Sequence, residues 1–455
     1  MVETWSVKDQ KSTKENINKL IEFRQAIYEN GMLARCDAMF DLLDALLSEG
    51  PVSSFAMLSQ SSRFQRKWPS LYAAVEDGEL DRAWLRTYLA RQIPLEGIQV
   101  FPLDGSPWPR PRSQVLDDRQ FVHQASSAVN GGTIIIGYPY SLLEWCAEPH
   151  SSWSLPVDVR RVPSAQTAQE VGAEQIQALA QARTDFLEAL DIVAADGKYG
   201  NAGFLRRVKG LRCGILARLR CDRVLYGPPP APLPHQKGRH RVHGARFAFK
   251  EPETWGMPDE VTELEDPYWG QVRLERWRGL HEKKGADVPY EVIRACVHLE
   301  RPKPPTALWL AWLTPEPRLT EIPVTVETIW RAYGCRWPVE PGLQFRKEML
   351  GWTQPRFQSK EVGDHWSELI SIACWMLFLA RSIVADTPLP WQKPQQRLTP
   401  QRVQQSLPPI FELIGSPAHP PKVRGKAPGW PQGRQRIPKQ RYKVVKKTPV
   451  VAKTA

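Results

Sequence analysis

Four residues in the C-terminal half of the chain combine side chains that suit phosphate and metal chemistry. Tyr333, Arg336, Glu340 and Lys347 follow the spacing Tyr-x2-Arg-x3-Glu-x6-Lys. At 100° per residue, these positions would fall within about 60° of one another on a helix. A carboxylate between two cations and a phenol is poorly suited to a core and well suited to a phosphate held near a metal ion. The pattern therefore indicates a candidate site for phosphate-ester chemistry.

Two prolines decide where a helix can carry this pattern. Pro338 and Pro341 flank Glu340, and proline is tolerated only in the first turn of a helix. We therefore expect the helix that carries Glu340 to begin near Pro338, with Tyr333 and Arg336 on the segment that enters it. The alternative is an ordinary amphipathic helix with surface ion pairs.

The spacing resembles that of the cut-and-paste DDE transposases of bacterial insertion sequences, in the superfamily named for its Tyr-Arg-Glu-Lys motif. The resemblance covers roughly residues 96–385. It implies an RNase H-like domain in which Glu340 is the third metal ligand, after two aspartates carried on strands. It also implies a homodimer that nicks paired transposon ends and joins the freed 3′-hydroxyls to target DNA.

Asp104 and Asp196 are the best candidates for the two aspartates. Each follows an apolar run of the kind that forms a strand, and each is followed by glycine. Carboxylates at the ends of neighbouring strands project into one crevice, and a glycine beside them lets a phosphodiester approach the backbone. Either Asp-Gly pair alone would more often be a turn. Asp117 and Asp118 are weaker candidates, because neither follows an apolar strand.

The implied chemistry uses divalent metal ions. Hard oxygen ligands suit Mg²⁺, which takes one or two carboxylates alongside a substrate phosphate. Two such ions about 3.5–4 Å apart stabilise both the attacking and the leaving oxygen of an in-line displacement. By resemblance, Asp196 would bridge both Mg²⁺ ions, Asp104 and Glu340 would each complete one, and Mn²⁺ is a possible substitute.

Further residues around the three carboxylates are candidate DNA contacts. By resemblance, Arg336 and Lys347 would hold phosphates near the cut, and Tyr333 would contact the same backbone. Lys198 and Tyr199 follow Asp196 closely enough to reach the scissile region.

Tryptophans offer a different kind of contact, because the resemblance implies that a flipped base stacks on one of them. Trp309 and Trp312 are the candidates, although each sits in an apolar strand that favours a core position.

Positive charge is concentrated at the C-terminal end. The net charge is +12, and of the 43 residues after Glu412, 11 are Lys or Arg and none is acidic. This segment is also rich in Pro, Gly and Gln, so it is expected to be a flexible basic tail that binds a polyanion through counterion release. A merely solubilising tail is the alternative. The candidate DNA contacts in the tail are Lys422, Arg424, Lys426, Arg434 and Arg436.

The rest of the chain must build the elements that position these residues. Between residues 96 and 226 the order β-β-β-α-β-α-β indicates a mixed α/β core, with a capping box at Thr167 and Glu170 and a last strand at 215–226. We expect an N-terminal helical domain that could bind DNA ends (1–95), the first part of the RNase H-like core (96–226), a β-rich insertion (227–305), the second part of the core (306–390) and a Pro-rich basic tail (391–455).

Composition narrows the class of protein. Hydrophobic residues make up 42% and charged residues 24%, no apolar run reaches the length of a membrane span, and the polar start is unlike a signal peptide. Seven cysteines without a CxxC pair are typical of a reducing compartment. We expect a cytoplasmic bacterial protein associated with the nucleoid. A Mg²⁺-dependent nuclease of the same fold and a catalytically defective DNA-binding copy are the alternative functions.

Overall fold

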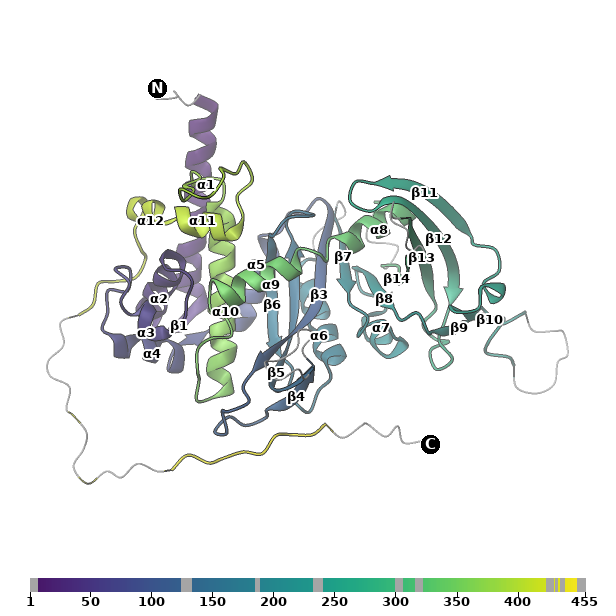
Figure 1. Cartoon of the computed structure of the whole chain (residues 1–455), viewed down its shortest axis with the longest axis horizontal. Helices are drawn as coiled ribbons and strands as arrows, with labels where there is room; N and C mark the ends of the chain where they lie inside the picture. The colour runs from purple at the N-terminus through teal and green to yellow at the C-terminus, as the bar shows by residue number, and fades with distance from the viewer. Residues whose placement is uncertain are drawn as a thin grey trace.

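The computed structural model describes residues 7–123, 133–184, 189–231, 240–298, 306–315, 322–422, 429, 433 and 438–447. One large mixed sheet runs through the middle of the molecule, with a group of helices at one end and a meander of long strands at the other (Figure 1). Within these ranges, no helix is long and apolar enough to cross a membrane.

The large sheet combines parallel and antiparallel pairing. Its strands are β3 (Gly97–Pro109), β4 (Gln120–His123), β5 (Ile134–Cys146), β6 (Ser154–Arg161), β7 (Ala189–Ala195), β8 (Gly214–Leu219), β11 (Glu260–Asp266), β12 (Gly270–Leu280), β13 (Tyr290–His298) and β14 (Thr306–Leu313). Their order is β11-β12-β13-β14-β8-β7-β3-β5-β4, with β6 also paired to β5. β7 is parallel to both β3 and β8. The predicted β-β-β-α-β-α-β order is therefore present, with β4 added at the edge.

Alternate residues of the central strands build two cores. Val193 and Ile215 belong to one buried cluster, whereas Ile192 and Leu216 belong to the other. Successive side chains of a strand point to opposite faces, so β7 is buried on both sides. This burial explains why its sequence is an almost continuous apolar run.

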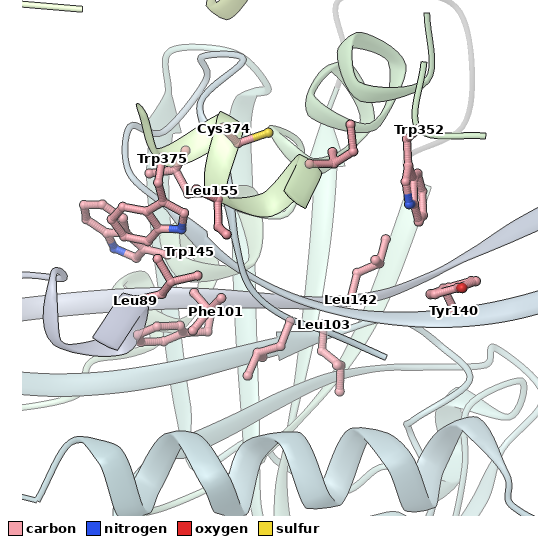
Figure 2. Close-up of a cluster of buried hydrophobic side chains, with 14 of the residues drawn as sticks. Leu89, Phe101, Leu103, Tyr140, Leu142, Trp145, Leu155, Trp352, Cys374 and Trp375 are labelled. Carbon is pink, nitrogen blue, oxygen red and sulfur yellow. The ribbon is translucent and has the colours of Figure 1, made fainter. Parts of the chain in front are cut away.

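Helices cover both faces of the sheet. On the first face lie α6 (Ala168–Ala182), which begins with the predicted capping box, and α7 (Ala202–Val208). On the second face α8 (Val326–Gly334) packs on the second cluster, and α9 (Val339–Glu348) and α10 (Lys360–Ala380) follow it along the chain and contact β6 (Figure 1). Figure 2 shows the core beside α10, where Trp375 stacks on Trp145 of β5 with 5.9 Å between ring centroids.

The N-terminal helices pack against α10. They are α1 (Val7–Ala26), the π-helix η1 (Ile27–Gly31), α2 (Cys36–Ser48), α3 (Phe55–Leu58), α4 (Trp68–Glu76) and α5 (Arg82–Arg91), with a small hairpin of β1 (Met32–Ala34) and β2 (Glu79–Leu80). Helices α1, α2 and α4 contact α10, and their apolar residues belong to the same buried cluster as the sheet. The helical segment and the sheet therefore share one hydrophobic core.

Two predicted boundaries are wrong. The strand predicted at 215–226 is two strands, β8 and β9 (Val224–Tyr226), because the chain turns at Cys221 and Asp222. The tail predicted from residue 391 starts later, because α11 (Pro400–Ser406) and α12 (Pro408–Ile414) fold onto α2 and bury Arg402 and Phe411. Between β9 and β11 the chain forms β10 (Arg246–Ala248), paired with β9, and the short 3-10 helix η2 (Pro252–Thr254).

Candidate active site

Asp104 and Asp196 lie side by side where the parallel ladder between β3 and β7 ends. Leu103 and Ala195 are the last paired residues of this ladder. The two aspartates are therefore next in register, on strands about 4.8 Å apart. Asp196 follows the end of β7, as predicted. Asp104 does not end its strand, because β3 continues to Pro109 by pairing with β5.

Nearby backbone amides orient both carboxylates. The N–H of Gly105 donates to Oδ1 of Asp104 (2.7 Å), and the N–H of Lys198 donates to Oδ1 of Asp196. Strand alternation places both side chains on the face of the sheet that α8 covers. Each aspartate side chain is 23% exposed, so a ligand can reach both.

The third carboxylate comes from the junction between α8 and α9. Tyr333 lies in the last turn of α8, Arg336 in the turn between the helices, and Glu340 in the first turn of α9, whose N-cap is Pro338. The helix therefore begins at the proline, as the sequence predicts. Glu340 is exposed, and its side chain makes no hydrogen bond or ion pair with the residues that the structure describes.

Two contacts fix this junction over the sheet. Arg346 of α9 forms an ion pair with Glu144 of β5, and their side chains are 3% and 0% exposed. The indole N–H of Trp330 on α8 donates to Oδ2 of Asp266 at the end of β11 (2.9 Å). Because an unpaired charge in such a buried place is strongly unfavourable, the Arg346–Glu144 pair holds α9, and with it Glu340, in one position.

Arg336 connects the helix junction to the first aspartate. Its Nη2 donates to Oδ2 of Asp104 (3.1 Å), and its Nη1 donates to Oη of Tyr333 (3.1 Å). Its Nε is buried and has no hydrogen-bond partner in the described part of the chain. Burial acts to lower the pKa of Arg336, but Tyr333, Asp104 and Asp196 raise the pKa overall. The guanidinium is thus held as a cation beside the carboxylates, with its Nε–H unpaired among the described residues.

The three carboxylates and Arg336 border one cleft of about 630 Å³. They are not gathered into a metal-binding cluster: across the described ranges, no three His, Cys, Asp or Glu side chains stand close enough to hold an ion. The donor set still fits a hard divalent cation, because carboxylate oxygens are the ligands that Mg²⁺ prefers and two of them are adjacent in register. Asp104 and Asp196 would hold such an ion, and Glu340 would complete the ligands from α9.

A larger groove of about 1030 Å³ adjoins the cleft and shares Asp104, Arg336 and Glu340 with it. Its walls are mostly apolar. The aromatic residues that line it are His150, Tyr268, Trp269, Trp330, Tyr333 and Trp337. Sequence reasoning missed most of this lining, because the residues come from three separate segments and follow no common local pattern.

The residues predicted to contact DNA near Asp196 have different environments. Lys198 is exposed, with Nζ 4.0 Å from Oδ2 of Asp196. Tyr199 is fully buried, so its predicted reach toward the substrate is wrong. Trp309 borders the cleft but is only 3% exposed, and its ring stacks on Phe249 with 4.0 Å between centroids. This environment agrees with the core position that the apolar strand favours, and stacking of Trp309 on a base stays a prediction.

The remaining predicted contacts lie away from the cleft. Lys347 is half-buried on α9 and borders neither the cleft nor the groove; burial, with Arg346 beside it, lowers the pKa of Lys347. Lys422 is exposed. The other tail residues named above, Arg424, Lys426, Arg434 and Arg436, lie outside the described residues.

Two cations that the sequence did not single out also border the cleft. Arg218 of β8 and Lys250 after β10 line it, and neither forms an ion pair with any described residue. The position of Arg218 depends on β8 pairing beside β7, so no local sequence signal could have identified it.

Fold and site together define a nuclease or transposase of the DDE class, in which carboxylates from neighbouring strands and a covering helix face one cleft. The family described as DDE superfamily endonuclease matches residues 29–283, more than half of the chain, and the protein belongs to this family. The matched range contains Asp104 and Asp196, whereas Glu340 lies beyond it. No curated protein matches the chain.

Proposed function

We propose that the protein is the DNA transposase of an insertion sequence, which cuts the transposon ends and joins the freed 3′-hydroxyls to target DNA. The observation that carries the proposal is the register of Asp104 beside Asp196, with Glu340 and Arg336 bordering the same cleft. Membership of the DDE superfamily endonucleases supports cleavage of DNA. The Tyr-x2-Arg-x3-Glu-x6-Lys spacing supports the narrower assignment to insertion sequences.

Each residue of the cleft has a role in this reaction. Bound Mg²⁺ or Mn²⁺ would supply Lewis acidity to the attacking and leaving oxygens. Asp104, Asp196 and Glu340 would hold the ions. Arg336 and Lys198 would contact the phosphate, since both cations already lie beside the carboxylates and the planar guanidinium donates two parallel hydrogen bonds to phosphate oxygens.

The proposed substrate is duplex DNA, both at the terminal inverted repeats and at the target. Tyr333 would contact the backbone close to the cut, and Lys347 would contact it further along α9. The basic residues after Glu412 would add affinity without reading sequence. Because two ends must be cut and joined together, we propose that a homodimer acts on paired ends in the bacterial nucleoid.

The proposal is tested by nicking. With Mg²⁺, the purified protein should nick a duplex that carries the terminal repeats bracketing its own gene. Asp196→Asn should bind this duplex as tightly as the unchanged protein and nick it roughly 100-fold more slowly. Asp222→Asn is the matched control, because Asp222 borders the same cleft but pairs with Arg220 at the surface (2.9 Å). Equal nicking by Asp196→Asn and by the unchanged protein would refute the assignment.

A nuclease of the same fold without strand transfer is the second candidate, and the description of the family as an endonuclease favours it. A copy that binds DNA but does not cut it is the third, favoured by carboxylates that are not gathered around an ion site in the described residues. Pre-cut ends with free 3′-hydroxyls, incubated with a supercoiled plasmid, separate the three. Joined products identify a transposase, nicking alone identifies a nuclease, and binding alone identifies a defective copy.

A further inference from the structure

Part of the basic tail returns to the edge of the sheet. Residues 438–447 run past β4, as the segment close to the C-terminal end in Figure 1. Val445 forms a parallel bridge with Gln120 of β4, and its N–H donates to the carbonyl of Arg119 (2.8 Å). The N–H of Tyr442 donates to the carbonyl of Gln114 (2.9 Å). Backbone pairing of this kind adds a short strand to an exposed sheet edge.

A buried arginine holds the segment from the other side. Arg119 is 2% exposed, and its Nη2 donates to the carbonyl of Tyr442 (3.1 Å). Its other N–H groups donate to carbonyls of the same loop, at Leu116, Arg110 and Pro111. Arg119 therefore links the tail to the folded loop through main-chain oxygens alone, which makes the contact independent of tail side chains.

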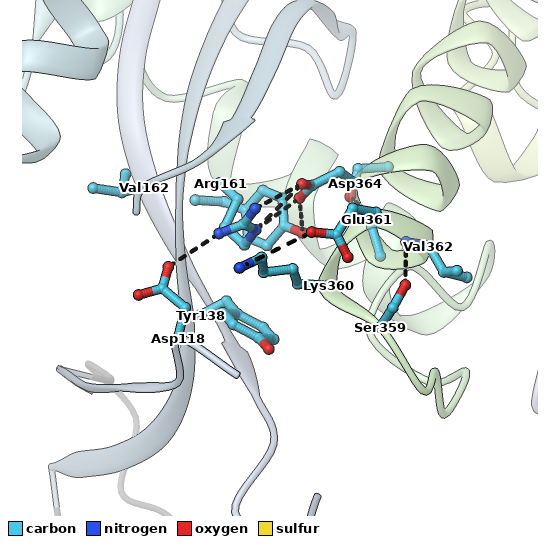
Figure 3. Close-up of polar contacts among 12 residues, drawn as sticks. Asp118, Tyr138, Arg161, Val162, Ser359, Lys360, Glu361, Val362 and Asp364 are labelled. Carbon is cyan, nitrogen blue, oxygen red and sulfur yellow. Dashed lines mark hydrogen bonds and ion pairs between the residues drawn. The ribbon is translucent and has the colours of Figure 1, made fainter. Parts of the chain in front are cut away.

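The loop that receives the tail is itself fixed. Figure 3 shows Arg161 between Asp118 and Asp364, with Nη1 3.2 Å from Oδ2 of Asp118 and Nη2 3.1 Å from Oδ2 of Asp364. Asp117 pairs with Lys360, and its carbonyl accepts from the hydroxyl of Tyr138 (2.6 Å). The two aspartates considered as alternative metal ligands thus anchor this loop to α10 and β5.

The segment carries a dense positive charge. Its cations are Lys439, Arg441, Lys443, Lys446 and Lys447, and none of them forms an ion pair with a residue that the structure describes. Val444 and Val445 are half-buried, whereas the cations are exposed. Nζ of Lys447 donates to the carbonyl of Gln166, just before α6 (2.6 Å).

The last cation of this segment, Lys447, contacts the residue just before Thr167, the N-cap of α6, and α6 in turn contacts the backbone beside Asp196. On the first turn of α6, the side chain of Gln169 donates to the carbonyl of Lys198 (2.6 Å), and Nζ of Lys198 lies 4.0 Å from Asp196. A chain of contacts through the first turn of α6 therefore connects the end of the basic segment to Lys198 beside Asp196.

We propose that residues 438–447 form a docked basic strand that extends the sheet at β4 and binds the phosphate backbone of duplex DNA leading to the cleft. Docking fixes the cations in place, so DNA binding does not have to order a free tail. The choice of DNA as the polyanion rests on the proposed function, whereas docking itself is tested without DNA.

Val445→Pro tests docking without altering charge. Proline at this position removes the N–H that binds the carbonyl of Arg119. Val444→Pro is the matched control, because the N–H of Val444 donates to no described residue. Trypsin should cut after Lys446 about fivefold faster in Val445→Pro than in Val444→Pro. Equal rates would overturn docking through this bond, and rates that depend on protein concentration would place the strand on a second copy.

Binding to a short duplex of arbitrary sequence then tests the ligand. The triple variant Arg441→Gln, Lys443→Gln, Lys446→Gln should lower the slope of log affinity against log salt by about 2–3. Val445→Pro, which keeps every charge, should weaken binding about threefold to tenfold. Unchanged binding in a released Val445→Pro variant would overturn a role for the docked geometry. Nicking at saturating DNA tests the catalytic proposal separately, since none of these residues borders the cleft.

Discussion

Nη2 of Arg336 lies 3.1 Å from Oδ2 of Asp104, so a guanidinium stands at the carboxylate that would hold a metal ion. Strand register has already brought Asp196 to the neighbouring position. A cation that belongs to the protein itself therefore occupies one oxygen of this pair of carboxylates. A divalent ion bound at Asp104 would compete with Arg336 for this oxygen, because like charges repel strongly at short distance.

Removal of this cation should strengthen metal binding. Arg336→Gln should bind Mn²⁺ about tenfold more tightly in calorimetry without DNA, because repulsion from the guanidinium is lost. Its nicking rate should fall, because the proposed phosphate contact is lost as well. Arg331→Gln is the control, since Arg331 is 72% exposed on α8 and pairs with Glu327. Mn²⁺ binding that is unchanged or weaker in Arg336→Gln contradicts the competition.

Replacement of Glu340 should reduce activity without reducing stability. Because its side chain is exposed and unpaired within the described ranges, Glu340→Gln should change the free energy of unfolding by less than about 1 kcal/mol. Nicking should fall roughly 100-fold if this carboxylate binds metal. Glu348→Gln, at the other end of the same helix, should leave nicking unchanged. A normal nicking rate in Glu340→Gln would remove Glu340 from the site.

Arg24 should be essential for stability rather than activity. It is 2% exposed, pairs with Asp44 at 2.6 Å, and lies over the ring of Phe411 in α12. Arg24→Met would leave Asp44 buried without its partner and should cost about 3–5 kcal/mol of unfolding free energy, measured by urea denaturation. Arg35→Gln, which breaks an exposed pair with Asp77, should cost less than about 1 kcal/mol. Similar losses in both variants would contradict the importance of burial.

His365 should make stability depend on pH. Burial lowers the pKa of His365 to about 4, and its Nδ1–H donates to the carbonyl of Val75 (3.0 Å). The pKa of His365 in the folded protein lies below the unfolded value near 6.5. Its contribution to the free energy of unfolding is therefore complete above pH 6.5 and is lost as pH falls toward 4. The slope of the free energy of unfolding against pH should reach about 1.4 kcal/mol per pH unit.

Glu368 changes the pH dependence of the free energy of unfolding in the opposite direction. It must therefore be replaced before the contribution of His365 can be measured. Burial raises the pKa of Glu368 to about 7, so its contribution is lost as pH rises from its ordinary value toward 7. Urea denaturation between pH 4 and 7 should therefore compare Glu368→Gln with the double variant that also carries His365→Gln. Equal slopes in the two proteins would rule out a titrating His365.

Local signals in the sequence were enough to predict the central elements. The apolar run before Asp196 is β7, the capping box at Thr167 begins α6, and Pro338 is the N-cap of α9. Each of these signals acts within one turn or one strand, so it can be recognised from a short stretch of the sequence. The same locality explains why Asp104, Asp196 and Glu340 could be named as candidates, although their metal-binding role stays a prediction.

Features that depend on tertiary packing were not predictable in this way. Trp309 was assigned to DNA, yet its neighbour Phe249 lies 60 residues away and reaches it only through the fold. The helices α11 and α12 contain prolines typical of a tail, but α2 supplies the apolar surface that orders them. Arg119 and Tyr442 likewise meet only because the chain returns to β4.

The position of β14 has a mechanical consequence. Because β14 is hydrogen-bonded to β8 on one side and to β13 on the other, the outer strands β11–β13 continue the plane of the aspartate-bearing strands. Within the described residues, the two groups of strands are joined edge to edge by these hydrogen bonds. Five strand spacings separate β11 from β7, so the outer edge stands roughly 24 Å from Asp196 along the sheet. A ligand bound at that edge would therefore lie at a fixed distance from the cleft.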